Sequence, residues 1–291
     1  MRLPRSFAQV DVFAPRPGQG NPLAVIRADD SLGAEQMQAM AAWLDLAETT
    51  FVLPPTVAGA DYRLRIFTSR QEIAFAGHPS IGSAHAALSE GWLARPENAV
   101  LMQECRAGVL PLRLAGSSGA ISVRVPRSRI AAQAPDHAPL LRAALGDRQL
   151  AGLAPALVEG GRRWWLAELA DEAQVREMQP DAAAILALAH ASDSLGLCVF
   201  ARSPGQDHDL VVRAFPLGVG LPEDPASGAA NAAIAAFLDE AGALGELGRS
   251  YRVSQGRELG RDAELMLEID ADDQVWVGGL SHTVVSGSIR W

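Results

Sequence analysis

The chain has 291 residues and a formal net charge of −9, with 48% hydrophobic and 20% charged residues. This length allows two modest domains, since a typical domain has about 100 to 200 residues. No apolar run approaches the roughly 18 residues of a membrane-spanning helix, and the acidic excess disfavours nucleic acid and anionic lipid as partners. The composition therefore predicts a globular protein that stays out of the membrane, binds no nucleic acid and acts on a small molecule.

Runs rich in β-branched and aromatic residues predict strands, and an apolar stretch at 34–43 predicts a helix. Proline-rich sequence at 115–140 resembles a linker and is expected to contain the domain boundary. Strands are expected on both sides of it, at 8–13, 23–26, 49–53, 62–67, 164–169, 195–201, 210–215, 265–269 and 275–277. The second half of the chain thus resembles the first.

Segments 78–88 and 224–234 align without a gap. Pro, Gly and three Ala coincide, the offset is 224 − 78 = 146 residues, and each segment follows a strand that ends in Arg-x-Phe. Self-similarity at an offset near half the chain indicates an internal duplication. The alternative is a chance match between two helices made of small residues.

Each of these segments begins as a helix is expected to begin. His78 and Asp224 stand where an N-cap belongs, and Pro79 and Pro225 follow at a position where proline loses no hydrogen bond. The small residues beyond predict buried helices, and therefore two α+β domains in which a curved sheet surrounds a helix. The unpaired N–H groups of such helix starts favour an anionic group such as a carboxylate, and the two starts are expected to face a common cleft. The helices are expected to end at Gly91 and Gly242.

Known cofactor and metal motifs are absent from the sequence. It contains no GxGxxG, no P-loop, no CxxC and no pair of histidines at the spacing of common zinc motifs. Cys105 and Cys198 are expected to be buried, inert thiols. The start of the chain lacks the apolar segment of a secretory signal, which predicts a cytoplasmic protein. We expect an enzyme without cofactor or metal.

Glu48 is an acid at the mouth of the apolar run Thr49 to Leu53. Partial desolvation in such a place raises the pKa of a carboxyl, which suits a general base that must later return its proton. A solvated glutamate at the edge of a strand is the alternative.

Five ordered motifs resemble the PhzF-like family of phenazine-biosynthesis isomerases. They are Gln19-Gly-Asn-Pro-Leu-Ala-Val25, Glu48-Thr-Thr-Phe-Val-Leu-Pro54, Arg65-Ile-Phe-Thr68, Phe75-Ala-Gly-His-Pro79 and Glu223-Asp-Pro-Ala-Ser-Gly228. The resemblance implies the fold of diaminopimelate epimerase: two pseudo-symmetric domains, each a barrel-like, mostly antiparallel sheet around a central helix, often in a homodimer. It places an N-terminal domain at 1–120, to which 280–291 return, and a C-terminal domain at 121–279.

The resemblance also implies a site and a reaction. Glu48 matches the family's acid/base, and the family's founding activity is the isomerisation of trans-2,3-dihydro-3-hydroxyanthranilate without a cofactor. His78 and Asp224 are expected to bind or polarise the substrate. A substrate carboxylate, on a small cyclic or amino-acid-like molecule, is expected to accept backbone N–H bonds from Gly77, Ser227, Gly228 and Ala229.

This chain departs from the family's usual pattern at Ala47 and Ala229, where hydroxyl side chains are common. The loss of two hydroxyls leaves the substrate open. Two alternative functions remain. One is a racemase or epimerase on the same scaffold, although no cysteine stands at either helix start. The other is a carboxylate-binding module without turnover.

Overall fold

The computed structural model describes residues 4–116, 118–133 and 137–291, which leaves out part of the N-terminal sequence used to predict location, and Pro135 of the expected linker. It divides into two compact units. Met1–Arg124 and Gly278–Trp291 form one, the N-terminal domain, and Val125–Val277 form the other, the C-terminal domain. The boundaries expected from the sequence, after residues 120 and 279, compare with 124 and 277 here.

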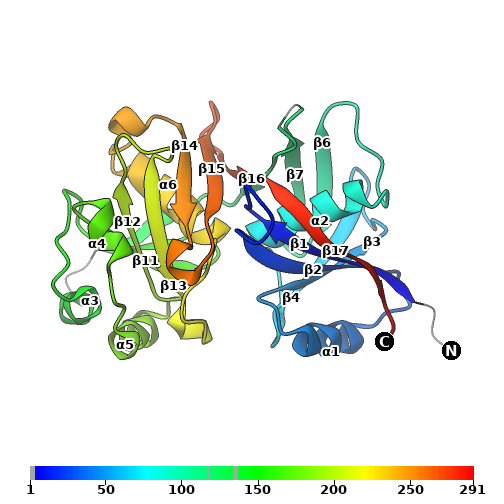
Figure 1. Cartoon of the computed structure of the whole chain (residues 1–291), viewed down its shortest axis with the longest axis horizontal. Coiled ribbons are helices and arrows are strands. Elements are labelled where there is room, and N and C mark those ends of the chain that lie inside the picture. Colours follow the sequence, from blue (N-terminus) through cyan, green and yellow to red (C-terminus); the bar gives the residue numbers. More distant parts are fainter. Residues whose placement is uncertain (1–3, 117, 134–136) are drawn as a thin grey trace. The chain divides into compact units, whose positions relative to one another are not determined.

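The N-terminal domain contains nine strands and two helices among the residues described (Figure 1). The strands are β1 (Arg5–Val12), β2 (Asn21–Arg27), β3 (Thr49–Leu53), β4 (Tyr62–Phe67), β5 (Glu72–Ile73), β6 (Val100–Cys105), β7 (Gly108–Leu114), β8 (Ile121–Val125) and β17 (Ser281–Ile289). The helices are α1 (Ala34–Leu44) and α2 (Gly77–Ser89). β17, from the end of the chain, pairs antiparallel with β1.

The C-terminal domain holds the remaining elements. Its strands are β9 (Arg129–Gln133), β10 (Ala156–Glu159), β11 (Arg163–Glu168), β12 (Leu197–Arg202), β13 (Leu210–Phe215), β14 (Ser250–Gln255), β15 (Ala263–Ile269) and β16 (Val275–Gly279). Its α-helices are α3 (Ala138–Leu145), α4 (Glu172–Arg176), α5 (Ala182–Ser192) and α6 (Gly228–Glu240). Short 3-10 turns are η2 (Leu217–Val219), η3 (Gly245–Leu247) and η4 (Arg257–Leu259).

Both domains repeat one order of strand pairing. From β1 through β2, β3, β4 and β6 to β7, the successive pairs are antiparallel, parallel, antiparallel, parallel and antiparallel. The same alternation runs from β10 through β11, β12, β13 and β14 to β15. The helices α2 and α6 occupy the same place in this order, after the fourth strand. This agreement supports the duplication inferred from the sequence.

The central helices are buried nearly all round, as their small residues predict. Ten of the thirteen residues are buried in α2 and likewise in α6. α2 packs on β1, β2 and β17, where a Cβ on Gly82 would come within 2.6 Å of Val12 Cγ2 and 2.7 Å of Leu23 Cδ2. The predicted α+β fold, with a mainly antiparallel sheet around a central helix, is confirmed. The mixed sheet does not close, so it is not a complete barrel.

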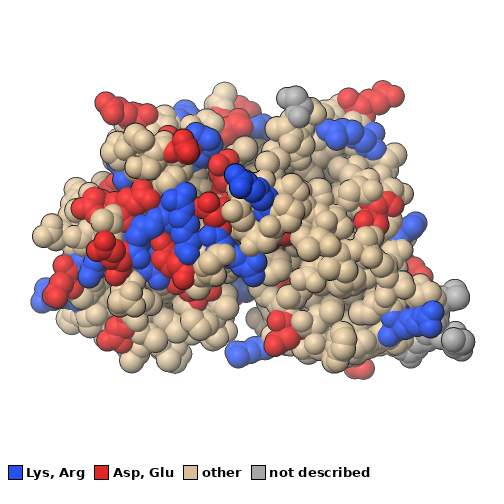
Figure 2. Space-filling model, viewed as in Figure 1, with Lys and Arg blue, Asp and Glu red and all other residues tan. Residues whose placement is uncertain are grey.

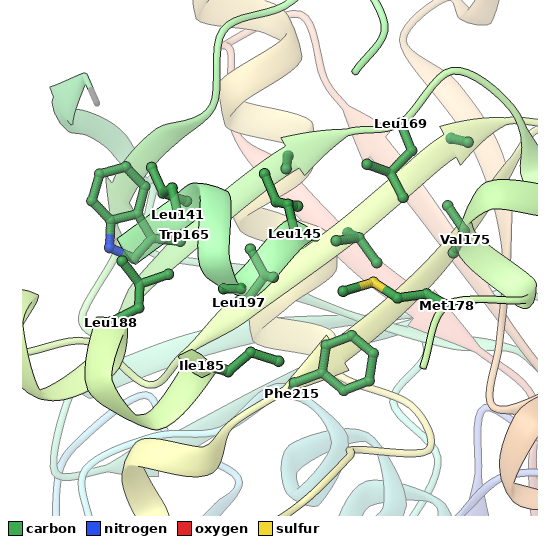
Figure 3. Packing of buried hydrophobic residues seen from close by; sticks show 14 of the residues in the cluster. Leu141, Leu145, Trp165, Leu169, Val175, Met178, Ile185, Leu188, Leu197 and Phe215 are labelled. Atoms are coloured by element: carbon green, nitrogen blue, oxygen red, sulfur yellow. The ribbon is translucent and has the colours of Figure 1, made fainter. Parts of the chain in front are cut away.

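A second layer of helices covers the outer side of each sheet. In the N-terminal domain α1 places Met37 and Met40 in a core with Phe51 and Phe67, whose rings meet edge to face at 5.5 Å. In the C-terminal domain α3, α4 and α5 cover a larger core around Trp165 and Phe215 (Figure 3). Each domain therefore has its own hydrophobic core.

Most of the expected elements are confirmed, and the linker is not. β3, β4 and β13 have the predicted limits. Sequence at 115–140 was expected to form a linker, but β8 and β9 occupy much of it. In Ile121-Ser-Val-Arg-Val125 buried and half-exposed residues alternate, which is the period of a strand. Pro126 lies just after β8, so this proline separates two strands rather than marking a long loop.

Charged side chains of both signs are interspersed on the visible face of the C-terminal domain (Figure 2). Every basic side chain apart from histidine is an arginine, because the chain contains no lysine. No helix in the described ranges is long and apolar enough to cross a membrane.

Candidate active site

Glu48 lies just before β3, on the side of the strand that faces α2. Thr50 in β3 lies 2.7 Å, Oγ1 to Oγ, from Ser83 of α2. Side chains two residues apart along an extended chain share a face, so Glu48 is directed toward α2 as well. Its Oε2 lies 3.6 Å from Nδ1 of His78, in the first turn of that helix. The structure thus brings together two of the residues predicted to act in the site.

His78 is buried, with 6% of its surface exposed. Burial lowers the pKa of its imidazole to about 3, and the Pro22 carbonyl beside the ring offsets this only in part. The ring is therefore neutral at neutral pH, and its contact with Glu48 is not an ion pair. A carboxylate near Nδ1 favours the tautomer with the proton on that nitrogen. Nε2 is buried and has no hydrogen-bond partner in the described part of the chain.

The helix starts differ from the prediction that His78 and Asp224 are N-caps. The N-cap of α2 is Ala76, with φ −152° and ψ 144°, so Gly77 and His78 are the first two helical residues. The N-cap of α6 is Ser227, whose side chain accepts a hydrogen bond from Ala230 N. Asp224 instead bonds to β13, because its N–H donates to the Ala214 carbonyl at 2.9 Å.

Both expected helix ends are confirmed, since Gly91 and Gly242 have φ of +68° and +64°.

The other predicted residues gather at the start of α6. Asp224 Oδ1 accepts a hydrogen bond of 3.2 Å from Ala226 N, which shapes the turn before the helix. The N–H of Ser227 donates to Gln255 Oε1 at 3.2 Å, so this predicted donor is already engaged within the protein. The N–H groups of Gly228 and Ala229 belong to the first helical turn, where helix geometry supplies no backbone acceptor.

Sequence reasoning missed two buried glutamines that hold these helix starts. Gln103 Nε2 donates to Ser80 Oγ at 3.0 Å, and Gln255 Nε2 donates to the Asp224 carbonyl at 2.8 Å. A single glutamine in a strand gives no signal of such a role, because its partners lie 23 and 31 residues away.

The cysteines do not take part in either helix start. Burial was correctly predicted for Cys198, in β12, but not for Cys105, which lies at the end of β6 and is only half-buried. Burial raises the pKa of both thiols, so neither is a thiolate at neutral pH. Within 4–116, 118–133 and 137–291, no three His, Cys, Asp or Glu side chains are grouped to hold a metal ion.

Comparison with known proteins identifies relatives over nearly the whole chain. The family model described as "Phenazine biosynthesis-like protein" matches residues 10–287. The chain is 33% identical to "Antisense-enhancing sequence 1" of Schizosaccharomyces pombe, covering 97% of each chain. It is 32% identical to "Trans-2,3-dihydro-3-hydroxyanthranilate isomerase" of Pseudomonas aeruginosa, covering 89% of this chain and 88% of that one.

Solved structures agree with the fold. A PhzF-family phenazine biosynthesis protein of Bacillus anthracis superposes with a TM-score of 0.83 at 22% identity, over 100% of both chains. A protein of Pseudomonas aeruginosa described as a predicted epimerase gives a TM-score of 0.78 at 27% identity, over 98% of this chain and 99% of that one. With the family model and the isomerase relatives, these matches show that the chain belongs to the phenazine biosynthesis-like family and is an isomerase of the PhzF type.

Proposed function

We propose that this isomerase moves a proton between two carbons of a small cyclic or amino-acid-like carboxylate, with Glu48 as the single acid/base. The observation that carries the proposal is the 3.6 Å approach of the Glu48 carboxylate to the neutral, buried imidazole of His78. The neutral imidazole places no positive charge beside the Glu48 carboxylate. A positioned carboxylate of this kind suits the transfer of a proton from carbon.

In the proposed reaction one proton leaves the substrate and one proton is returned to it. Glu48 takes a proton from an activated C–H bond, and the electron pair left behind shifts a double bond along the conjugated system. The protonated Glu48, whose carboxyl proton exchanges with solvent, then gives a proton to a second carbon of that system. Substrate and product therefore have the same composition, as an isomerisation requires.

The remaining site residues are assigned to binding. His78 polarises a polar group of the substrate, and Asp224 binds another. Backbone N–H groups of Gly77, Gly228 and Ala229 hold the carboxylate, since N–H groups at a helix start favour an anion. The Ser227 N–H, also predicted to bind the carboxylate, already donates to Gln255 Oε1 and so does not take this role.

The arrangement gives less support to a racemase that uses two thiols. Such chemistry needs a thiolate on each side of the reacting carbon, and the half-buried Cys105 and the buried Cys198 belong to β6 and β12, not to the helix starts. A racemase that uses Glu48 with Asp224 or His78 remains the second candidate, because proton return to the same carbon needs only a second acid on the opposite face.

The test is a proton NMR time course in D2O with trans-2,3-dihydro-3-hydroxyanthranilate and a panel of small carboxylates. We expect solvent deuterium to enter a substrate carbon, or the double bond to move, with the wild type. Glu48→Gln is expected to lower this rate by about 100-fold or more, since a general base contributes about 10² to 10⁴. Glu35→Gln, on the exposed face of α1, is the matched control and should leave the rate unchanged.

The outcomes separate the candidate functions. Deuterium at a new carbon supports the proposed isomerisation. Inversion with deuterium at one carbon supports the racemase, and binding without exchange supports a non-catalytic module. A folded Glu48→Gln protein that exchanges as fast as the wild type rejects Glu48 as the base.

A further inference from the structure

The segment from Asp224 to Ser227 has no regular structure of its own to hold it. α6 begins only at Gly228, and the N–H of Asp224 forms an isolated bridge to Ala214. Within the turn the Asp224 carboxylate accepts a hydrogen bond from Ala226 N, and bonds from outside the turn to its backbone restrict the segment further. The structure supplies those bonds from β14.

Gln255, the last residue of β14, forms hydrogen bonds to this segment through both the nitrogen and the oxygen of its side-chain amide. Its Nε2 donates to the Asp224 carbonyl at 2.8 Å, and its Oε1 accepts from Ser227 N at 3.2 Å. The same Oε1 accepts from Asn231 Nδ2 at 2.9 Å, and Asn231 Nδ2 also donates to the Ser227 carbonyl at 2.8 Å. Only 1% of Gln255 is exposed, so these bonds do not compete with water.

Gly256, the residue just after β14, lies with its backbone against the same turn. Gly256 has φ +92°, and a Cβ there would come within 2.5 Å of the Pro225 carbonyl oxygen. Only glycine combines this left-handed conformation with so close an approach. Gln255 and Gly256 therefore hold successive residues of one segment, Asp224 and Pro225.

The N-terminal domain also has a buried glutamine near its helix start, at a different place in the strand pairing: Gln103 lies opposite Tyr62, the first residue of β4, whereas Gln255 lies opposite Val212, the third residue of β13. Gln103 lies in β6, the strand that follows α2, as β14 follows α6. Gln103 Nε2 donates to Ser80 Oγ, which in turn donates to the Ala76 carbonyl at the N-cap of α2. Tyr62 OH donates to Gln103 Oε1 at 2.9 Å and fixes the orientation of the amide. Both domains thus have a buried glutamine that forms hydrogen bonds at a helix start, although the two glutamines do not stand at equivalent positions of the strand pairing.

We propose that Gln255 is a positioning residue for the isomerase: its amide fixes the backbone that carries Asp224 and occupies the Ser227 N–H. The N–H groups at this helix start that helix geometry leaves without a backbone acceptor are then those of Gly228 and Ala229. This inference rests on the proposed function, in which Asp224 binds the substrate. Gln255 itself touches no reacting atom, and its proposed role is to hold the residues that bind the substrate.

The test compares two variants. Gln255→Met removes both the donor and the acceptor of the amide and keeps a side chain of similar length, whereas Gln255→Glu keeps the acceptor and loses the donor. Gln274→Met is the matched control, because Gln274 Nε2 also donates to a backbone carbonyl, that of Asp272, in an exposed turn of the same domain. The first readout needs no substrate. It is the set of backbone amide NMR signals of 224–229, with the hydrogen-exchange rate of Ser227 N–H.

We expect these signals to shift in both Gln255 variants, and Ser227 exchange to quicken by about tenfold or more in Gln255→Met, since that bond is lost. The second readout is turnover of trans-2,3-dihydro-3-hydroxyanthranilate. We expect kcat to fall by about 10- to 100-fold in Gln255→Met, with a smaller fall in Gln255→Glu, because a misplaced site group costs about that much. Gln274→Met should match the wild type in both readouts.

Unchanged amide signals in a folded Gln255 variant overturn the inference. Shifted signals with unchanged kcat and KM overturn the link to the reaction. If Gln255→Met does not fold, Gln255→Glu decides by the same two readouts. If the wild type turns over nothing, the proposed function fails for this substrate, while the amide signals still decide whether Gln255 holds the segment.

Discussion

Arg213 in β13 donates two hydrogen bonds of 2.9 Å, from Nε and Nη2, to the carboxylate of Glu223, the residue just before Asp224. The N-terminal domain has the same pair, since Arg65 in β4 donates two bonds of 2.8 Å to Glu72. Each guanidinium also lies over the phenylalanine two residues on, at 5.0 and 5.2 Å. The Arg-x-Phe repeat in the sequence thus marks a repeated ion pair ahead of each central helix.

We predict that Arg213→Met destabilises the protein by about 3–5 kcal/mol, the usual effect of removing one partner from a buried ion pair. The side chains of Arg213 and Glu223 are only 6% and 9% exposed, so the remaining carboxylate would be buried without its partner. The change also removes the bond of 2.6 Å from Nη1 to the Met178 carbonyl. Urea unfolding, followed by circular dichroism, measures the effect.

The matched control is Arg65→Met in the other half of the duplication. That pair is more exposed, with 25% of Arg65 accessible, so we expect a smaller loss of stability. The double change Arg213→Met with Glu223→Leu should recover part of the loss, because it leaves no lone charge. Equal losses at Arg65 and Arg213 would contradict this account.

We predict that His78 makes folding less stable as the pH falls. Its folded pKa of about 3 lies below the ordinary value of 6.5, so between these values the unfolded chain binds a proton that the folded chain does not. Stability therefore declines as the pH drops below about 6.5, by about 1.4 kcal/mol per pH unit from this group, and His78 has no effect at higher pH.

Urea unfolding of the wild type and His78→Gln at pH 7 and pH 5 tests this sign. On moving to pH 5 the wild type should lose about 2 kcal/mol more than the variant, which has no imidazole to protonate. His190→Gln, at an exposed position of α5, serves as the control and should follow the wild type. An imidazole of His78 that titrates near pH 6.5 by NMR would disprove the prediction.

We predict that Gly82→Ala destabilises the N-terminal domain by about 1–3 kcal/mol through overpacking. The added methyl would lie 2.6 Å from Val12 Cγ2, in the contact between α2 and β1. Val12→Ala removes that atom, so the double variant should lose less than the sum of the single variants. Gly287→Ala, where a Cβ meets nothing within 4 Å, should change the stability little. Thermal unfolding compares these four variants with the wild type.

Local sequence predicted the elements whose pattern depends on near neighbours. Strand β3 was identified from its run of β-branched and aromatic residues, and helix α1 from its apolar stretch, because both signals lie within the segment itself. The sequence failed at the N-caps of α2 and α6. Pro79 and Pro225 fit the first turn of a helix, but where each helix begins depends on tertiary contacts, including the bridge between Asp224 and Ala214.

The sequence by itself determined the family, the duplication and the identity of the candidate base, because ordered motifs and an offset of 146 residues are properties of the chain alone. The tertiary structure decided how that site is held. It placed His78 3.6 Å from Glu48, made the imidazole neutral by burying it, and brought Gln255 to Asp224 across 31 residues. Burial and long-range hydrogen bonds arise only when distant segments pack together, so no local pattern encodes them.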